Sequence, residues 1–210
     1  AEGARMRILV VGDSISQGVF DKDGGRLESL KRCSSKEFTQ GSDYLTFFNM
    51  SISGDFSKNV LARLENELQA RVWPGEDQVI IFAVGINDSI IVSGKNAVTE
   101  NEFKQNLSSI SKIAKTYSSK ILFVGLTPVI EELVQPVSWD KNIRYSNDRI
   151  ELFNGVIQSL CEKNHLKFVD VHHVFKGSKN IQSLFDDGIH PTADGHELIF
   201  KTVLPEFNRL

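Results

Sequence analysis

Cysteine is scarce in this sequence: the 210 residues include only Cys33 and Cys161. Two cysteines so far apart provide neither a disulfide framework nor the ligand spacing of a metal site, and they fit a reducing, cytoplasmic compartment. Positive charge is not in excess either, because 24 lysines and arginines face 27 aspartates and glutamates, for a net charge of -3. Without a basic field to attract phosphate groups, we expect no binding to nucleic acid.

Long apolar runs are also missing. The longest of them, such as residues 79–86, fall far short of the roughly 20 residues that cross a bilayer, so we expect no membrane span. The start of the chain, AEGARM, lacks the apolar segment of a secretory signal, which a mature secreted protein would already have lost. We interpret residues 1–5 as an added segment before a native Met6. No polar linker divides the chain, and its length fits one domain over residues 1–210.

Short apolar runs alternate with amphipathic segments, which is the pattern of a parallel sheet covered by helices on both faces. The apolar runs predict strands at 7–12, 45–52, 78–85, 120–126 and 166–171. The amphipathic segments predict helices at 55–72, 99–117, 146–163 and 193–204, and a less regular one at 27–36. We expect N-caps from Asp55 or Ser57, from Thr99 and from Thr192. The predicted fold class is α/β: a three-layer α/β/α sandwich whose five-stranded parallel sheet is doubly wound in the flavodoxin-like order.

The polar motifs of the chain fall where such a sheet carries function, at the carboxyl ends of its strands. The first three strands end at GDS (12–14), SISGD (51–55) and VGINDS (84–89), and the last leads to FDDGIHPTADGH (185–196). The segment 127–145 exceeds the usual length of a connection and is predicted to be a lid or specificity loop.

These motifs contain the parts of a serine-based acyl-transfer site. Ser14 is the candidate nucleophile, and a serine hydroxyl needs a base, such as His190, to activate it. Asp187 lies three residues before His190 and can hold its imidazole within one turn; Asp186 competes for that role. Each motif alone also fits a polar turn. Their conjunction at the strand ends favours a site.

A developing oxyanion also needs hydrogen-bond donors. The candidates are the backbone N–H groups of Ser14 and Gly54 and the side-chain amide of Asn87. Gly54 has no side chain to block a close approach.

The motifs VVGDSIS, NMSISGD, VGINDS and DGIHPTADGH together resemble the four blocks of the SGNH hydrolases, also called the GDSL esterase/lipase family, over about residues 7–200. The resemblance implies that Ser14 is both nucleophile and first oxyanion donor, that Gly54 and Asn87 are the other donors, and that His190 is the base with Asp187 as its partner. Ile15 replaces the leucine of the family's short name, a change of packing rather than chemistry. YSNDRIELFNGVI and VQPVSW are similar to bacterial acylhydrolases near the thioesterase I and lysophospholipase-like branch.

Our leading hypothesis is a serine hydrolase that cleaves a small acylated substrate, ester or thioester, through an acyl-enzyme on Ser14, with no cofactor and no metal. One alternative keeps the site but transfers the acyl group to another alcohol, or is a degenerate family member. Another is a flavodoxin-like signalling module, for which the chain lacks the acidic cluster and the lysine of a phospho-receiver. A dinucleotide site is disfavoured because GDSISQG lacks the G-x-G-x-x-G spacing. No motif indicates an oligomeric state.

A few other polar and aromatic residues have competing interpretations. Asp13 and Asp88 adjoin candidate site residues and are predicted to fix their loops by hydrogen bonding. Trp139 and Tyr145 are candidates for an acyl pocket and equally for local packing. His196 is predicted to lie at a helix end or on a helix surface, near the last loop.

Overall fold

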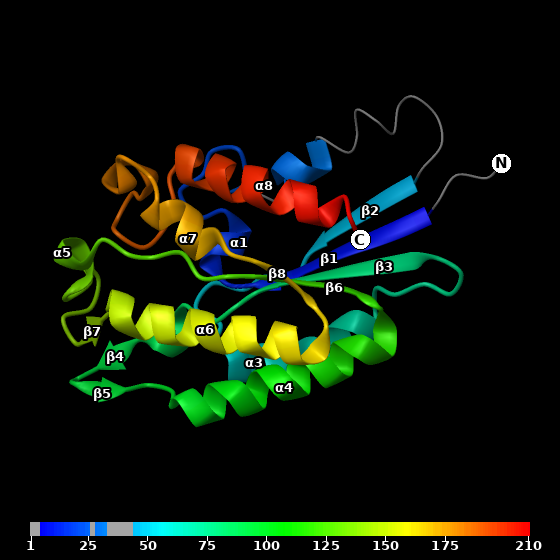
Figure 1. Cartoon of the computed structure of the whole chain (residues 1–210), viewed down its shortest axis with the longest axis horizontal. Helices are drawn as coiled ribbons and strands as arrows, with labels where there is room; N and C mark the ends of the chain where they lie inside the picture. Colours follow the sequence, from blue (N-terminus) through cyan, green and yellow to red (C-terminus); the bar gives the residue numbers. More distant parts are fainter. Residues whose placement is uncertain (1–4, 26–27, 33–43) are drawn as a thin grey trace.

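The computed structural model describes residues 5–25, 28–32 and 44–210. At its centre lies a parallel sheet of five strands in the order β2-β1-β3-β6-β8 (Figure 1). These strands are β1 (Arg5–Gly12), β2 (Tyr44–Asn49), β3 (Asp77–Ala83), β6 (Lys120–Val124) and β8 (Lys167–Val169). Numbered among themselves they run 2-1-3-4-5, which is the flavodoxin-like order. The predicted fold class is therefore confirmed.

The two strands at the heart of the sheet are buried on both faces. Residues 8–11 of β1 and 79–82 of β3 are at most 2% exposed, and the strands pair with Leu9 opposite Ile80. Successive side chains of a strand point to opposite faces, so continuous burial requires cover on both sides of the sheet. This double cover explains why these strands appear in the sequence as unbroken apolar runs.

Helices form a layer on each face of the sheet (Figure 1). One layer contains α3 (Ser57–Gln69), α4 (Glu100–Tyr117) and α6 (Asn147–Asn164). The other contains α1 (Ser14–Gln17), α7 (Val171–Lys176) and α8 (Ala193–Phe207). The four long helices predicted from the sequence are confirmed, with ends that differ by at most three residues. Residues 28–32 are helical as well; the rest of the helix predicted at 27–36 lies outside the described residues.

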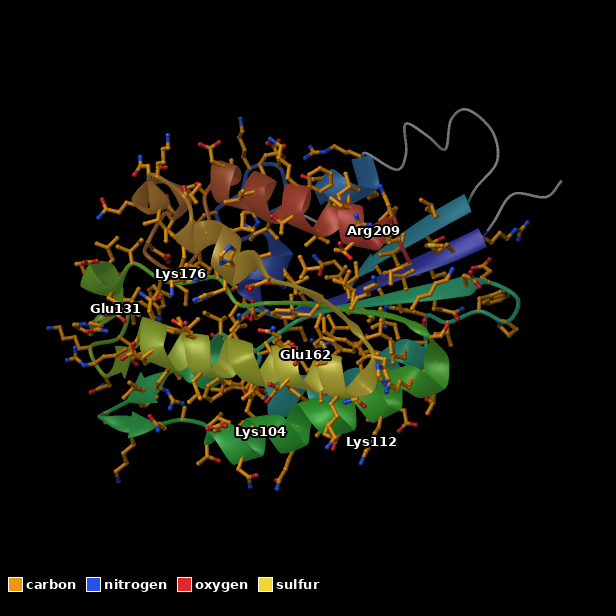
Figure 2. The ribbon with its side chains drawn as sticks, in the orientation of Figure 1. Lys104, Lys112, Glu131, Glu162, Lys176 and Arg209 are labelled. Carbon is orange, nitrogen blue, oxygen red and sulfur yellow. The ribbon has the colours of Figure 1, made fainter. Side chains whose placement is uncertain are left out.

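The long helices are amphipathic, as their spacing predicts. Helix α4 buries Phe103, Leu107 and Ile110 against its neighbours, while Lys104 and Lys112 lie on its exposed side (Figure 2). In the described part of the chain, no helix has the length and apolar character needed to span a membrane.

Two of the three predicted helix caps are present. The Thr99 hydroxyl accepts the Glu102 N–H at the start of α4, and that of Thr192 accepts the Gly195 N–H at the start of α8. The cap predicted for α3 is wrong, because the helix begins after Phe56. Asp55 instead pairs with an arginine of α3, and Ser57 already lies inside the helix.

The segment 127–145 is more ordered than a long loop. It contains α5 (Glu131–Val134) and β7 (Ile143–Arg144), and β7 joins β4 (Ile91–Val92) and β5 (Lys95–Asn96) in an antiparallel sheet of order β5-β4-β7. Strands of two residues are too short for an alternating pattern to show in the sequence.

The last strand of the central sheet ends before its predicted end. The sequence predicts a strand at 166–171, but Asp170 accepts the His173 N–H and starts α7.

Candidate active site

The candidate nucleophile lies at the turn between β1 and α1. Strand β1 ends at Gly12, where a Cβ atom would come within 2.7 Å of the Ala83 carbonyl oxygen, so the sharp turn requires glycine. The Asp13 carboxylate then accepts the Ile15 N–H at 3.0 Å and caps α1. Ser14, the first residue of that helix, is thereby placed at the carboxyl edge of the sheet.

A chain of hydrogen bonds connects Ser14 to the last loop. The Ser14 Oγ lies 2.9 Å from His190 Nε2, and His190 Nδ1 lies 2.7 Å from Asp187 Oδ2. A carboxylate only accepts, so Nδ1 carries the proton and Nε2 is free to accept from the serine hydroxyl. The structure thus brings together three candidates, Ser14, Asp187 and His190, of which the first and last lie 176 positions apart in the sequence.

Asp187 is held as an ionised acceptor. Its second oxygen accepts the backbone N–H groups of Ile189 at 3.0 Å and His190 at 2.8 Å. Burial raises the pKa of Asp187, but the hydrogen bonds from His190 and Ile189 outweigh burial and keep this pKa below its ordinary value. The competing Asp186 is exposed and meets His190 through its backbone, whose N–H donates to the His190 carbonyl at 2.9 Å.

The candidate oxyanion donors lie on the strands that flank β1. The chain after β2 continues along β1, where the Ile52 N–H donates a hydrogen bond to the Gly12 carbonyl at 3.1 Å. It then reaches Gly54, whose φ of +81° is a conformation that favours glycine. Within the described ranges, the backbone N–H groups of Ser14 and Gly54 donate to no protein acceptor. Both donors are therefore available to a ligand.

The third candidate donor, Asn87, begins a short 3-10 helix, η1 (Asn87–Ser89), after β3. Its Nδ2 donates to the Asp55 carbonyl at 3.0 Å, which places the amide next to Gly54. The Tyr145 hydroxyl donates to Asn87 Oδ1 at 3.3 Å. Since a carbonyl cannot donate, these two partners fix which end of the amide is nitrogen, and the second N–H of Nδ2 is left for a substrate.

Tyr145, which the sequence left open between an acyl pocket and local packing, contacts the candidate oxyanion donor Asn87 instead. It is 4% exposed, and burial, together with the negative charges of Asp13 and Asp187, raises the pKa of its hydroxyl well above the ordinary value. The hydroxyl therefore stays protonated and can donate. No sequence spacing could reveal this contact, because Tyr145 and Asn87 are 58 positions apart and meet through the small sheet.

Asp88 holds η1 in place through hydrogen bonds of its carboxylate, which is the role predicted from its position beside Asn87. It is fully buried and accepts the backbone N–H of Ser57 at 2.8 Å and the Ser57 hydroxyl at 2.5 Å. Burial raises the pKa of Asp88 to about 6. Asn106 completes the network by donating to the Ser57 hydroxyl at 2.9 Å. This network ties the turn that carries Asn87 to helices α3 and α4.

The remaining histidines do not form a metal site. His172 and His173 lie on α7, which follows β8, and His172 Nδ1 bonds to the Leu126 carbonyl oxygen at 3.2 Å. Across residues 5–25, 28–32 and 44–210, no three histidine, cysteine or carboxylate side chains gather as metal ligands. His196 lies in the first turn of α8, which agrees with the predicted helix end, but it does not lie on a surface, because it is 2% exposed and packs near Gly25.

The chain is similar to known proteins in both sequence and fold. The sequence matches the GDSL-like lipase/acylhydrolase family over residues 10–198. It is 26% identical over 208 residues to an arylesterase of Vibrio mimicus, which covers 98% of this chain and 90% of that protein. The crystal structure of TesA is 25% identical, with a TM-score of 0.72 over 97% of this chain and 98% of TesA.

A lipase/acylhydrolase from Enterococcus faecalis shares the fold at 20% identity, with a TM-score of 0.76 over 97% of this chain and 96% of that one. The resemblance drawn from the four sequence motifs is confirmed by the family match, which spans most of the chain. The chain therefore belongs to the GDSL-like lipase/acylhydrolase family and is a hydrolase of the esterase class.

Proposed function

We propose that this protein hydrolyses carboxylic esters or thioesters through an acyl-enzyme on Ser14. The observation that carries the proposal is the hydrogen-bonded chain from Ser14 through His190 to Asp187, with distances of 2.9 Å and 2.7 Å. Ser14 Oγ attacks the acyl carbonyl while His190 Nε2 takes its proton. Asp187 keeps the imidazole in the reactive tautomer and stabilises the imidazolium that forms.

The negative charge that develops on the carbonyl oxygen meets three donors. These are the backbone N–H groups of Ser14 and Gly54 and the free N–H of Asn87 Nδ2. Removing one such donor from a comparable site costs about 3–4 kcal/mol of transition-state stabilisation. His190 then gives its proton to the leaving group, and a water molecule, deprotonated by the same imidazole, releases the acid.

Covalent labelling tests the acyl-enzyme step directly. A fluorophosphonate should react once per chain, and mass spectrometry of the digest should place the adduct on Ser14. Because labelling needs the base as well as the nucleophile, it should be lost in His190→Ala. An adduct on another serine, or labelling that persists in His190→Ala, would contradict the mechanism.

Tyr145 acts in this mechanism as a positioning residue, because it touches Asn87 rather than the substrate. Tyr145→Phe should lower kcat about tenfold with KM nearly unchanged, since the amide then loses one of the two partners that orient it toward the transition state. Kinetics with 4-nitrophenyl acetate measure both constants. Tyr117→Phe, at the end of α4, is the matched control and should behave as the wild type.

A double mutant separates positioning from general stability. In Asn87→Ala, the orientation of the amide no longer matters, so adding Tyr145→Phe should cause no further loss of kcat. Losses that multiply in the double mutant would show that Tyr145 supports activity by another route.

A further inference from the structure

Two large aromatic side chains stand in solvent beside His190. Phe20 is 60% exposed and Trp139 is 53% exposed. Their ring centroids lie 5.4 Å and 6.1 Å from that of the imidazole. They come from separate segments, Phe20 from the turn after α1 and Trp139 from the connection between α5 and β7. We call these two side chains the aromatic rim.

Burial in the core does not account for the aromatic rim. Side chains of this size usually contribute to stability by losing contact with water, and these two keep more than half of their surface exposed. Other exposed apolar side chains gather at the same end of the sheet: Leu133 lies against Gly188, and Ile52 beside the end of β1 is 45% exposed. Apolar surface concentrated around reactive groups is typical of a binding site.

The backbone of Phe20 points to the same conclusion. Its φ of +65° lies in the left-handed region, which is unfavourable for a bulky residue. Gly18, two residues earlier, has a similar φ of +76° without that cost. A strained residue that gains little burial is typical of a position retained for function.

The place of the rim relative to the reaction identifies the part of the substrate that it contacts. This step rests on the proposed function. His190 Nε2 must hand its proton to the departing oxygen or sulfur, so the leaving group lies beside the imidazole. The acyl oxygen lies instead toward Gly54 and Asn87, at the ends of the flanking strands. Groups in ring contact with His190 therefore flank the leaving group rather than the acyl chain.

We propose that Phe20 and Trp139 form a two-ring subsite for an apolar leaving group, and that the substrate is an ester or thioester of an apolar alcohol or thiol. Contact with the rings removes apolar surface of the leaving group from water. This binding free energy also stabilises the transition state, because the leaving group stays between the rings while the bond to Ser14 forms.

The test holds the acyl group constant and varies the alcohol. Benzyl acetate carries an apolar leaving group, and 2-methoxyethyl acetate carries a polar one. Phe20→Ala and Trp139→Ala should each lower kcat/KM for benzyl acetate about tenfold and leave the value for 2-methoxyethyl acetate within about twofold. Trp73→Ala is the matched control, because Trp73 is 60% exposed but precedes β3 at the opposite edge of the sheet, and it should change neither value.

A second substrate series separates the two sides of the ester. Lengthening the acyl group from acetyl to butyryl, with benzyl alcohol unchanged, should alter kcat/KM by the same factor in the wild type and in both variants. A factor that changes in the variants would place the rim on the acyl side. Equal losses for benzyl and 2-methoxyethyl esters would show a structural role, and either result would overturn the proposal.

Phe20→Gly distinguishes a binding role from a structural one. Glycine relieves the unfavourable φ, so the melting temperature should rise by about 2–4 °C while kcat/KM for benzyl acetate falls as in Phe20→Ala. A lower melting temperature would assign Phe20 to packing.

The experiments distinguish failure of the subsite from failure of the proposed function. If the wild type hydrolyses both esters and the rim variants have the same kcat/KM values, only the subsite is ruled out. If no ester is hydrolysed and Ser14 is not labelled, the proposed function is ruled out.

Discussion

Ser14→Ala should lower kcat for 4-nitrophenyl acetate by about 10⁶-fold, the loss seen when the nucleophile of a comparable triad is removed. Without Oγ there is no hydroxyl for His190 to deprotonate, and no acyl-enzyme forms. The donors at Gly54 and Asn87 would still bind the substrate carbonyl, so KM should change far less than kcat. Steady-state kinetics over a wide range of enzyme concentration measure the loss.

The fold should tolerate this substitution. Among the described residues, the Ser14 hydroxyl makes one hydrogen bond, to His190, while the cap of α1 depends on Asp13 and the turn depends on Gly12. Ser14→Ala should therefore keep the wild-type circular dichroism and melting temperature. Ser53→Ala offers a control, because its hydroxyl is exposed at the end of the neighbouring strand and bonds to Gln17. Activity of Ser14→Ala within tenfold of Ser53→Ala would rule out Ser14 as the nucleophile.

The regular layers of this fold were predictable because burial leaves a periodic trace in the sequence. Strands β1 and β3 are covered on both faces, so their apolar runs are continuous, and α4 shows Phe103, Leu107 and Ile110 at helical spacing. The short elements were not predictable. Strands β4, β5 and β7 have two residues each and form only because they pair with one another.

The candidate site likewise contains some contacts that were predictable from the sequence and others that were not. Asp187 and His190 are three residues apart, so their contact is local and follows from spacing. Ser14, Gly54 and Asn87 follow adjacent strands, and their common edge follows from the sheet order. The positions of Tyr145 and Trp139 depend instead on where the connection 127–145 returns to the sheet, which requires the folded chain.

Asp187→Asn should lower kcat by about 10⁴-fold near neutral pH, which is the effect of the corresponding change in a serine protease triad. Asparagine can keep an oxygen for the backbone N–H groups of Ile189 and His190, so the loop should retain its shape. Its amide N–H₂ would then face His190 Nδ1 and donate to it. That contact requires the tautomer with the proton on Nε2, which cannot accept the proton of Ser14.

Asp186→Asn is the matched control for this prediction. Asp186 adjoins Asp187 and carries the same charge, but it is exposed and contacts His190 through backbone atoms, which the substitution leaves in place. It should retain kcat within about twofold of the wild type, since an exposed charge is screened by solvent. A large loss in Asp186→Asn with little change in Asp187→Asn would transfer the orienting role to Asp186. Equal losses in both variants would indicate that the net charge of the loop, rather than the tautomer of His190, controls the reaction.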